Sequence, residues 1–146
     1  MFFARDGHSS KLYEKDKKNN VKIGQLGIYK AVKINGKWEL KESLPINSIS
    51  YSVSHPSLSK DGKTLYFSSN MPGGFGETDI WKMDILEDGY GKPENLGTNI
   101  NSAGREAFPY ITEDEVLYFA SNGKQGFGGL DIFKIDLKEA NEPINL

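Results

Sequence analysis

The sequence predicts an all-β fold made of consecutive four-stranded antiparallel units, about two and a half to three blades of a partial β-propeller. Three observations predict it: an internal repeat with a period of about 52 residues, short hydrophobic runs separated by Asp-Gly turns, and no sustained helical periodicity. Short strands at regular spacing also fit a sandwich or a barrel. A repeat of about 50 residues with four strands favours a propeller blade.

The repeat is strongest between residues 65–84 and 117–136, where 12 of 20 positions are identical. Gly27-Ile28-Tyr29 stands one period before Asp79-Ile80-Trp81, so a fainter copy precedes these two. We therefore treat residues 1–146 as a single repeat domain. Its units are a divergent one at about 1–50 with a lysine-rich insertion at 11–22, one at 51–102, and an incomplete one at 103–146.

Each unit is expected to hold four strands. In the unit at 51–102, the expected strands are 55–59, 63–68, 80–85 and a short one near 94–96. Asp-Gly pairs at positions 61–62 and 88–89 separate alternating hydrophobic runs, which is a strong hairpin signal. The rings of Tyr66-Phe67 and Tyr118-Phe119 alternate along their strands, so we expect one ring on each face of a sheet.

Composition excludes several classes of function. The 18 basic and 20 acidic residues give a net charge of −2, without the basic excess expected of a nucleic-acid-binding protein. The absence of cysteine excludes disulfides and thiolate metal sites, and two histidines cannot form a three-histidine site. No apolar run is long enough for a membrane-spanning helix, and no signal peptide is visible. We expect no nucleic-acid partner, no direct membrane span and no cofactor.

Two segments carry a family resemblance. Residues 56–70, PSLSKDGKTLYFSSN, resemble the WD40-like repeat of TolB-type β-propellers. A longer pattern runs through Gly73-Gly74-Phe75-Gly76, Pro93-Glu94-Asn95-Leu96-Gly97, Glu106-Ala107-Phe108-Pro109-Tyr110 and Gly126-Phe127-Gly128-Gly129. It resembles the propeller of OmpA-family outer-membrane-associated proteins, including the PorE-like accessory component of the type IX secretion system. The match is dense over 54–137 and weak over 1–50.

The resemblance implies a non-catalytic protein-interaction scaffold of the bacterial cell envelope, periplasmic or associated with the outer membrane. Its partners would be other envelope proteins. Fewer than three blades do not close a propeller, so we expect one of three arrangements: copies associate to complete a ring, the chain is excised from a longer polypeptide, or the blades form an open arc. The peptidoglycan-binding residues of that family have no counterpart in this sequence. Two alternatives share the fold. One is a carbohydrate-binding propeller that uses Trp38, Trp81 and Tyr90, and the other is the propeller fragment of a prolyl-oligopeptidase-type hydrolase.

Arg105 and Glu106 are the leading candidates for partner binding, because they enter the first strand of the last unit and arginine occurs only twice. Arg105 can pair with a partner's carboxylate, or it can form a salt bridge with Glu106 or a neighbour. His55 precedes Pro56 as Phe108 precedes Pro109, and this exchange with an aromatic residue favours packing over catalysis. No Gly-x-Ser-x-Gly elbow accompanies His55 or His8, so no catalytic triad is assigned.

Asp79 and Asp131 each follow a glycine-rich loop, at 73–76 and 126–129. The loops lack the context of a phosphate-binding loop and are expected to form bulged turns. Each carboxylate is expected to accept backbone N–H groups of its loop, with a calcium ion as the alternative. The insertion at 11–22 is expected to be a solvated loop, with partner binding as its alternative.

Overall fold

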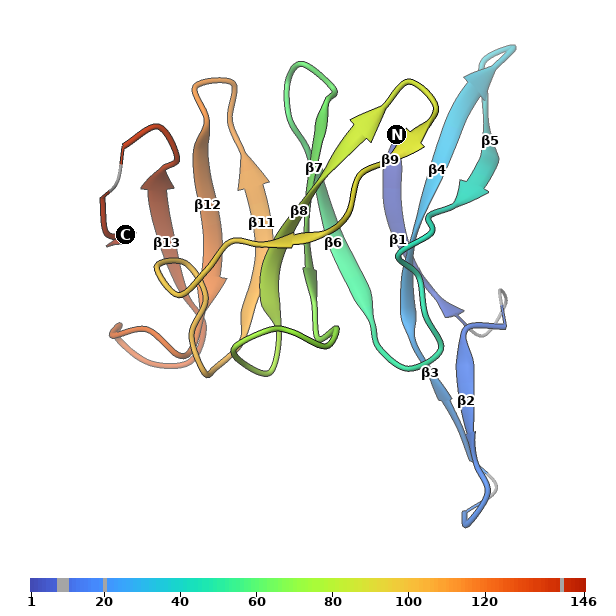
Figure 1. The fold of residues 1–146 in the computed structure, drawn as a ribbon, viewed down its shortest axis with the longest axis horizontal. Coiled ribbons are helices and arrows are strands. Elements are labelled where there is room, and N and C mark those ends of the chain that lie inside the picture. Colours follow the sequence, from blue (N-terminus) through green and yellow to red (C-terminus); the bar gives the residue numbers. More distant parts are fainter. Residues whose placement is uncertain (8–10, 20, 140) are drawn as a thin grey trace. The chain divides into compact units, whose positions relative to one another are not determined.

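The structure, a computed structural model, describes residues 1–7, 11–19, 21–139 and 141–146. Over these residues it contains strands and no helix, and the strands form antiparallel sheets (Figure 1). The prediction of an all-β fold is confirmed. His8 lies outside the described residues. Within the described ranges, no helix is long and apolar enough to cross a membrane.

The chain divides into two compact units, Met1–Ser54 (unit 1) and His55–Leu146 (unit 2). Unit 1 contains a three-stranded antiparallel sheet with the strand order β1-β4-β5. Its strands are β1 (Phe2–Asp6), β4 (Leu26–Ile34) and β5 (Lys37–Ser43). The most deeply buried side chains of β4 are Ile28 and Tyr29.

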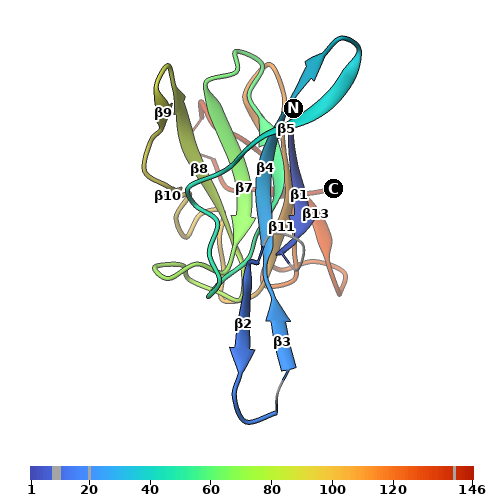
Figure 2. The same ribbon diagram turned by 90° about the vertical axis from the view of Figure 1, so that its right-hand side faces the viewer.

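The insertion at 11–22 contributes to a hairpin rather than to an irregular loop. Strand β2 (Tyr13–Asp16) pairs antiparallel with β3 (Val21–Gly24). Figure 2 shows the two strands side by side, extending away from β1 and β4. The Asp16 carboxylate accepts the backbone N–H of Lys18 and the side-chain amide of Asn19, which fixes the start of the turn. Alternation was too weak in this lysine-rich segment to predict strands.

Unit 2 holds two sheets of similar design, each with its strands in sequence order from one edge to the other. The second sheet follows β6-β7-β8-β10, with the short β9 also paired to β8. Its strands are β6 (Val53–Leu58), which crosses the boundary between the units, β7 (Thr64–Ser69), β8 (Asp79–Leu86), β9 (Gly89–Tyr90) and β10 (Glu94–Asn95). The third sheet consists of β11 (Glu106–Ile111), β12 (Val116–Ser121), β13 (Asp131–Asp136) and β14 (Ile144–Asn145).

The repeat in the sequence becomes a repeat in strand register. In the second sheet Ser69 lies opposite Asp79 and Leu65 opposite Met83. One period later, in the third sheet, Ser121 lies opposite Asp131 and Leu117 opposite Ile135. Because register determines which face each side chain occupies, equivalent residues of the two sheets lie on equivalent faces.

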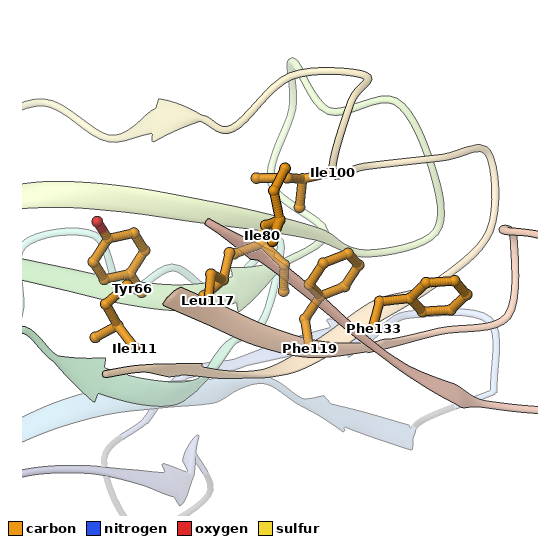
Figure 3. Packing of buried hydrophobic residues seen from close by; sticks show 8 residues of the cluster. Tyr66, Ile80, Ile100, Ile111, Leu117, Phe119 and Phe133 are labelled. Atoms are coloured by element: carbon orange, nitrogen blue, oxygen red, sulfur yellow. The ribbon is translucent and has the colours of Figure 1, made fainter. Parts of the chain in front are cut away.

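The core of unit 2 lies between its two sheets. Tyr66 and Ile80 of the second sheet belong to one buried cluster with Leu117, Phe119 and Phe133 of the third (Figure 3). The rings of Phe119 and Phe133 stack with centroids 5.8 Å apart. The face of the second sheet that carries Tyr66 and Ile80 is thereby covered by the face of the third sheet that carries Leu117, Phe119 and Phe133.

Candidate functional site

Strands β6 and β11 are edge strands of their sheets, and each contains a proline. Proline has no N–H to donate to a ladder, so it is tolerated at a sheet edge. The pairing of β11 with β12 shifts register between Ala107 and Tyr110, at Phe108-Pro109. His55 and Phe108, the residues before the two prolines, have φ values of 51° and 54°. A left-handed backbone conformation is costly for bulky residues. The backbone that sets the direction of both side chains is therefore strained.

The two strained residues contact each other. The rings of His55 and Phe108 lie 4.0 Å apart between centroids and are tilted by 41°. The Nδ1 atom of His55 is also hydrogen bonded to Ser68 Oγ at 2.7 Å. Phe108 nevertheless keeps 54% of its surface exposed. The equivalent positions of two repeats thus form an aromatic pair that is open to solvent.

Arg105 lies three residues before Phe108, and hydrogen bonds hold its backbone in place. Its backbone N–H donates to Asn122 Oδ1 at 2.7 Å, and its carbonyl accepts the N–H of Asn122. A parallel bridge to Thr78 further fixes its backbone. The Arg105 residue is exposed, and no ion pair links it to a carboxylate within the described part of the chain. Of the two roles expected for Arg105, the salt bridge with Glu106 or a neighbour is therefore not formed among the described residues.

Burial lowers the pKa of His55 below its ordinary value of 6.5, and the positive charge of Arg105 lowers this pKa further. Arg105 is therefore close enough to His55 for their charges to interact. The ring is held in its neutral form at neutral pH. The site then carries a single positive charge, that of Arg105.

The lowered pKa of His55 predicts a pH dependence of stability. The unfolded chain binds the proton more readily, so this contribution to stability is complete above about pH 6.5, the pKa in the unfolded chain, and is lost as the pH falls from there through the lower pKa of the folded state. His55→Phe inserts the residue found at the equivalent position 108 and removes this titration. We expect the melting temperature of the wild type to fall relative to that of His55→Phe between about pH 7 and pH 5. Parallel curves for the two proteins over this range would contradict the assignment.

Glu106 points away from this surface into the fold, and its side chain is fully buried. Its carboxylate accepts three hydrogen bonds, from the N–H and Oγ of Ser102 and from Oγ of Ser121. A buried carboxylate with three donors ties together the segment before β11 and the end of β12. The interpretation of Glu106 as a binding residue is corrected, because no partner reaches a side chain with no exposed surface.

The loop carboxylates have unequal environments. Asp79 is buried and accepts the backbone N–H groups of Phe75 and Gly76 and the side-chain amide of Asn95. Asp131 is only partly buried and accepts the N–H of Gly128 at 3.1 Å. Both carboxylates bind their own glycine-rich loop. Gly73 and Gly128 have φ values of 96° and 126°, which glycine adopts without strain.

Asparagine clamps are a feature that the sequence analysis did not predict. Asn101 Oδ1 accepts the N–H of Ile80 at 2.7 Å, and its Nδ2 donates to the Ile80 carbonyl at 3.0 Å. In unit 1, Asn47 makes the same two bonds to Ile28. Ile28 and Ile80 are one period apart, but the two asparagines are separated by 54 residues, which hid their equivalence. A search that allowed insertions within the repeat would have found them.

The three aromatic residues proposed for carbohydrate binding have different environments. Trp81 is buried, and its indole N–H donates to the Ser69 carbonyl at 3.3 Å. Its ring belongs to the interior, so its assignment as a binding residue is corrected. Tyr90 is half-buried in the two-residue strand β9. Trp38 is exposed and belongs to unit 1.

A polar groove lies between the β6–β7 and β11–β12 turns, with a cavity of about 340 Å³. Asp61, Glu113 and Glu115 contribute to its lining, and Lys60 joins the two turns through a 3.5 Å ion pair with Glu113. Burial raises the pKa of Tyr66, which also lines this groove, and the charges of Glu115, Asp61 and Asp84 add to the effect. The groove can accept a small polar or cationic group.

The two repeats of unit 2 differ in how far one face of each sheet is exposed to solvent. In the second sheet Tyr66, Ser68 and Ile80 are buried, with exposed fractions of 7%, 2% and 0%. One period later, Tyr118 and Ala120 are half-exposed and Ile132 is 56% exposed. We call the surface formed by Tyr118, Ala120 and Ile132 the open face. It also includes two residues that lie in the same row of cross-strand partners as Tyr118. These are Tyr110, opposite Tyr118, and Ile144, opposite Lys134.

No protein-family model matches the chain, and no curated protein matches it. The assignment of a function therefore depends on the repeat and on the two surfaces described above.

Proposed function

We propose that the sheets are consecutive blades of a partial β-propeller and that the chain is a non-catalytic protein-interaction scaffold. The resemblance to TolB-type and OmpA-family propellers supports a place in the bacterial cell envelope, periplasmic or at the outer membrane, with other envelope proteins as partners. Asn47 and Asn101 clamp the backbone of β4 and β8, which helps to hold two of the sheets rigid, as a scaffold requires. Rigid display of preformed surfaces lowers the entropic cost of binding a partner.

The observation that carries the proposal is the open face. Tyr118, Ala120 and Ile132 occupy positions that the preceding repeat covers with another sheet, and exposed apolar surface is typical of interaction sites. Tyr110 and Tyr118 lie 6.5 Å apart between ring centroids and offer aromatic contact area. Beside them lies a cavity of about 260 Å³, where Tyr118 and Ile144 meet the charged side chains of Lys134, Asp136, Glu139 and Glu142.

The occupant we propose is a second copy of the chain, in keeping with the expectation that copies associate to complete a ring. Light scattering over a concentration series tests this. We expect the mass to rise from 16.3 kDa towards twice that value as the concentration increases. Ile132→Glu places a charge in the open face and is expected to weaken association at least tenfold, because an unpaired buried charge is costly.

Leu86→Glu is the matched control. Leu86 is also 56% exposed and also lies in unit 2, but it is at the end of β8 and outside the open face. This variant should associate as the wild type does. A wild-type mass of 16.3 kDa at every concentration, or equal association by Ile132→Glu and the wild type, would contradict the proposed self-association.

A further inference from the structure

The second surface of unit 2, formed by His55, Phe108 and Arg105, points to a ligand of defined chemistry. We propose that it binds an acidic side chain of a protein partner, with the carboxylate on Arg105 and a neighbouring apolar group on the ring of Phe108. The surface shares strand β11 with the open face, whose Tyr110 lies two residues after Phe108, but it uses different side chains. Binding there extends the scaffold role to a second partner and does not depend on self-association.

The first support is the state of Arg105. Its backbone is fixed through Asn122 and Thr78, its side chain is exposed, and no described carboxylate forms an ion pair with it. A guanidinium binds a carboxylate through two parallel hydrogen bonds, and arginine is enriched where partners are anchored.

The second support is the strained aromatic pair beside it. His55 and Phe108 both hold positive φ values, and their rings contact at 4.0 Å. Backbone strain of this kind concentrates at sites that bind or switch. Here it presents the Phe108 ring, 54% exposed, three residues from Arg105. A ligand with an apolar group next to its carboxylate would use both contacts.

A single carboxylate is enough to neutralise the charge of the site. Burial and the neighbouring Arg105 disfavour protonation of His55, so the site offers one positive charge at neutral pH. A carboxylate carries one negative charge, whereas a phosphate monoester carries about −1.5 to −2 at pH 7. One guanidinium matches the former and leaves the latter partly uncompensated.

Titration calorimetry and amide-resolved NMR test the inference with the peptide acetyl-Gly-Phe-Glu-Gly-amide and its Glu→Gln counterpart. At protein concentrations where light scattering gives the monomer mass, we expect the Glu peptide to bind at least tenfold more tightly. Its chemical-shift changes should centre on residues 55, 105 and 108. Arg105→Gln should abolish the preference for Glu, and Arg105→Lys should restore part of it, because lysine keeps the charge without the planar fork.

Lys92→Gln removes one positive charge from an exposed position elsewhere in unit 2 and should bind the peptide as the wild type does. Equal binding of the two peptides, or full binding by Arg105→Gln, would overturn the inference. Inorganic phosphate binding at the same residues as tightly as the Glu peptide would also overturn it. Measurements on the monomer keep this result separate from the outcome of the self-association test.

Discussion

Replacing Glu106 by alanine is expected to lower the free energy of unfolding by about 3 to 5 kcal/mol, the largest effect of any single change considered for this chain. The substitution removes three hydrogen bonds from a side chain with no exposed surface. It leaves the N–H of Ser102 and the hydroxyl of Ser121 without their acceptor, and it opens a cavity beside β11. Equilibrium unfolding in urea, followed by tryptophan fluorescence, measures the loss.

Two further variants test whether the lost hydrogen bonds of Glu106 cause the destabilisation. Glu106→Gln keeps the volume but turns one acceptor into a donor, so part of the destabilisation should remain. Glu94→Gln alters an exposed carboxylate whose ion pair with Lys82 spans 3.5 Å, and exposed pairs contribute about 0 to 1 kcal/mol. If Glu106→Ala were no more destabilising than Glu94→Gln, the buried carboxylate would not stabilise the third sheet in the way described.

Asn101→Ala is expected to destabilise the protein by about 3 kcal/mol, because each unsatisfied buried group costs about 1 to 3 kcal/mol. Asn101 is buried, and its amide bonds to the N–H and carbonyl of Ile80 and to Asn95 Oδ1. The Ile80 carbonyl keeps a bond from the N–H of Leu96, so the unmatched N–H of Ile80 contributes most of the loss. The same unfolding titration measures it.

Asn99→Ala provides a control from the same loop. Asn99 is exposed and donates one hydrogen bond to the Asn141 carbonyl, so its replacement should change stability by no more than about 0.5 kcal/mol. Asn101→Asp preserves the size of the side chain but places an acceptor against the Ile80 carbonyl, and it should be nearly as destabilising as Asn101→Ala. A stable Asn101→Asp variant would show that packing, not the clamp, accounts for the effect of alanine.

The strands of unit 2 were predictable because their sequence signals are local. Alternating hydrophobic residues around Asp61-Gly62 predicted the β6–β7 hairpin, and the Ser59 hydroxyl and Lys63 N–H both donate to Asp61 in the turn that forms. The one-period offset from 65–84 to 117–136 also corresponds to the same register in both sheets. The hairpin β2–β3 was missed, because charged residues dominate it and little of it is buried.

The candidate site was predictable only in part, because side-chain direction depends on tertiary contacts. Sequence position singled out both Arg105 and Glu106, yet one is exposed and the other is fully buried. The exchange of His55 with Phe108 indicated packing, but not that the two residues pack on each other across two sheets. Trp81 has a large aromatic ring suited to sugar binding, and only the structure shows its burial.

The most direct test of the open face is hydroxyl-radical footprinting of Tyr66 and Tyr110 over a concentration series. Tyr66 is 7% exposed and should stay protected throughout. Tyr110 is 62% exposed and should be oxidised readily in dilute solution, then become protected as the mass measured by light scattering rises towards twice 16.3 kDa. Tyr110 oxidation that stays constant at every concentration would contradict the claim that a second copy covers this face.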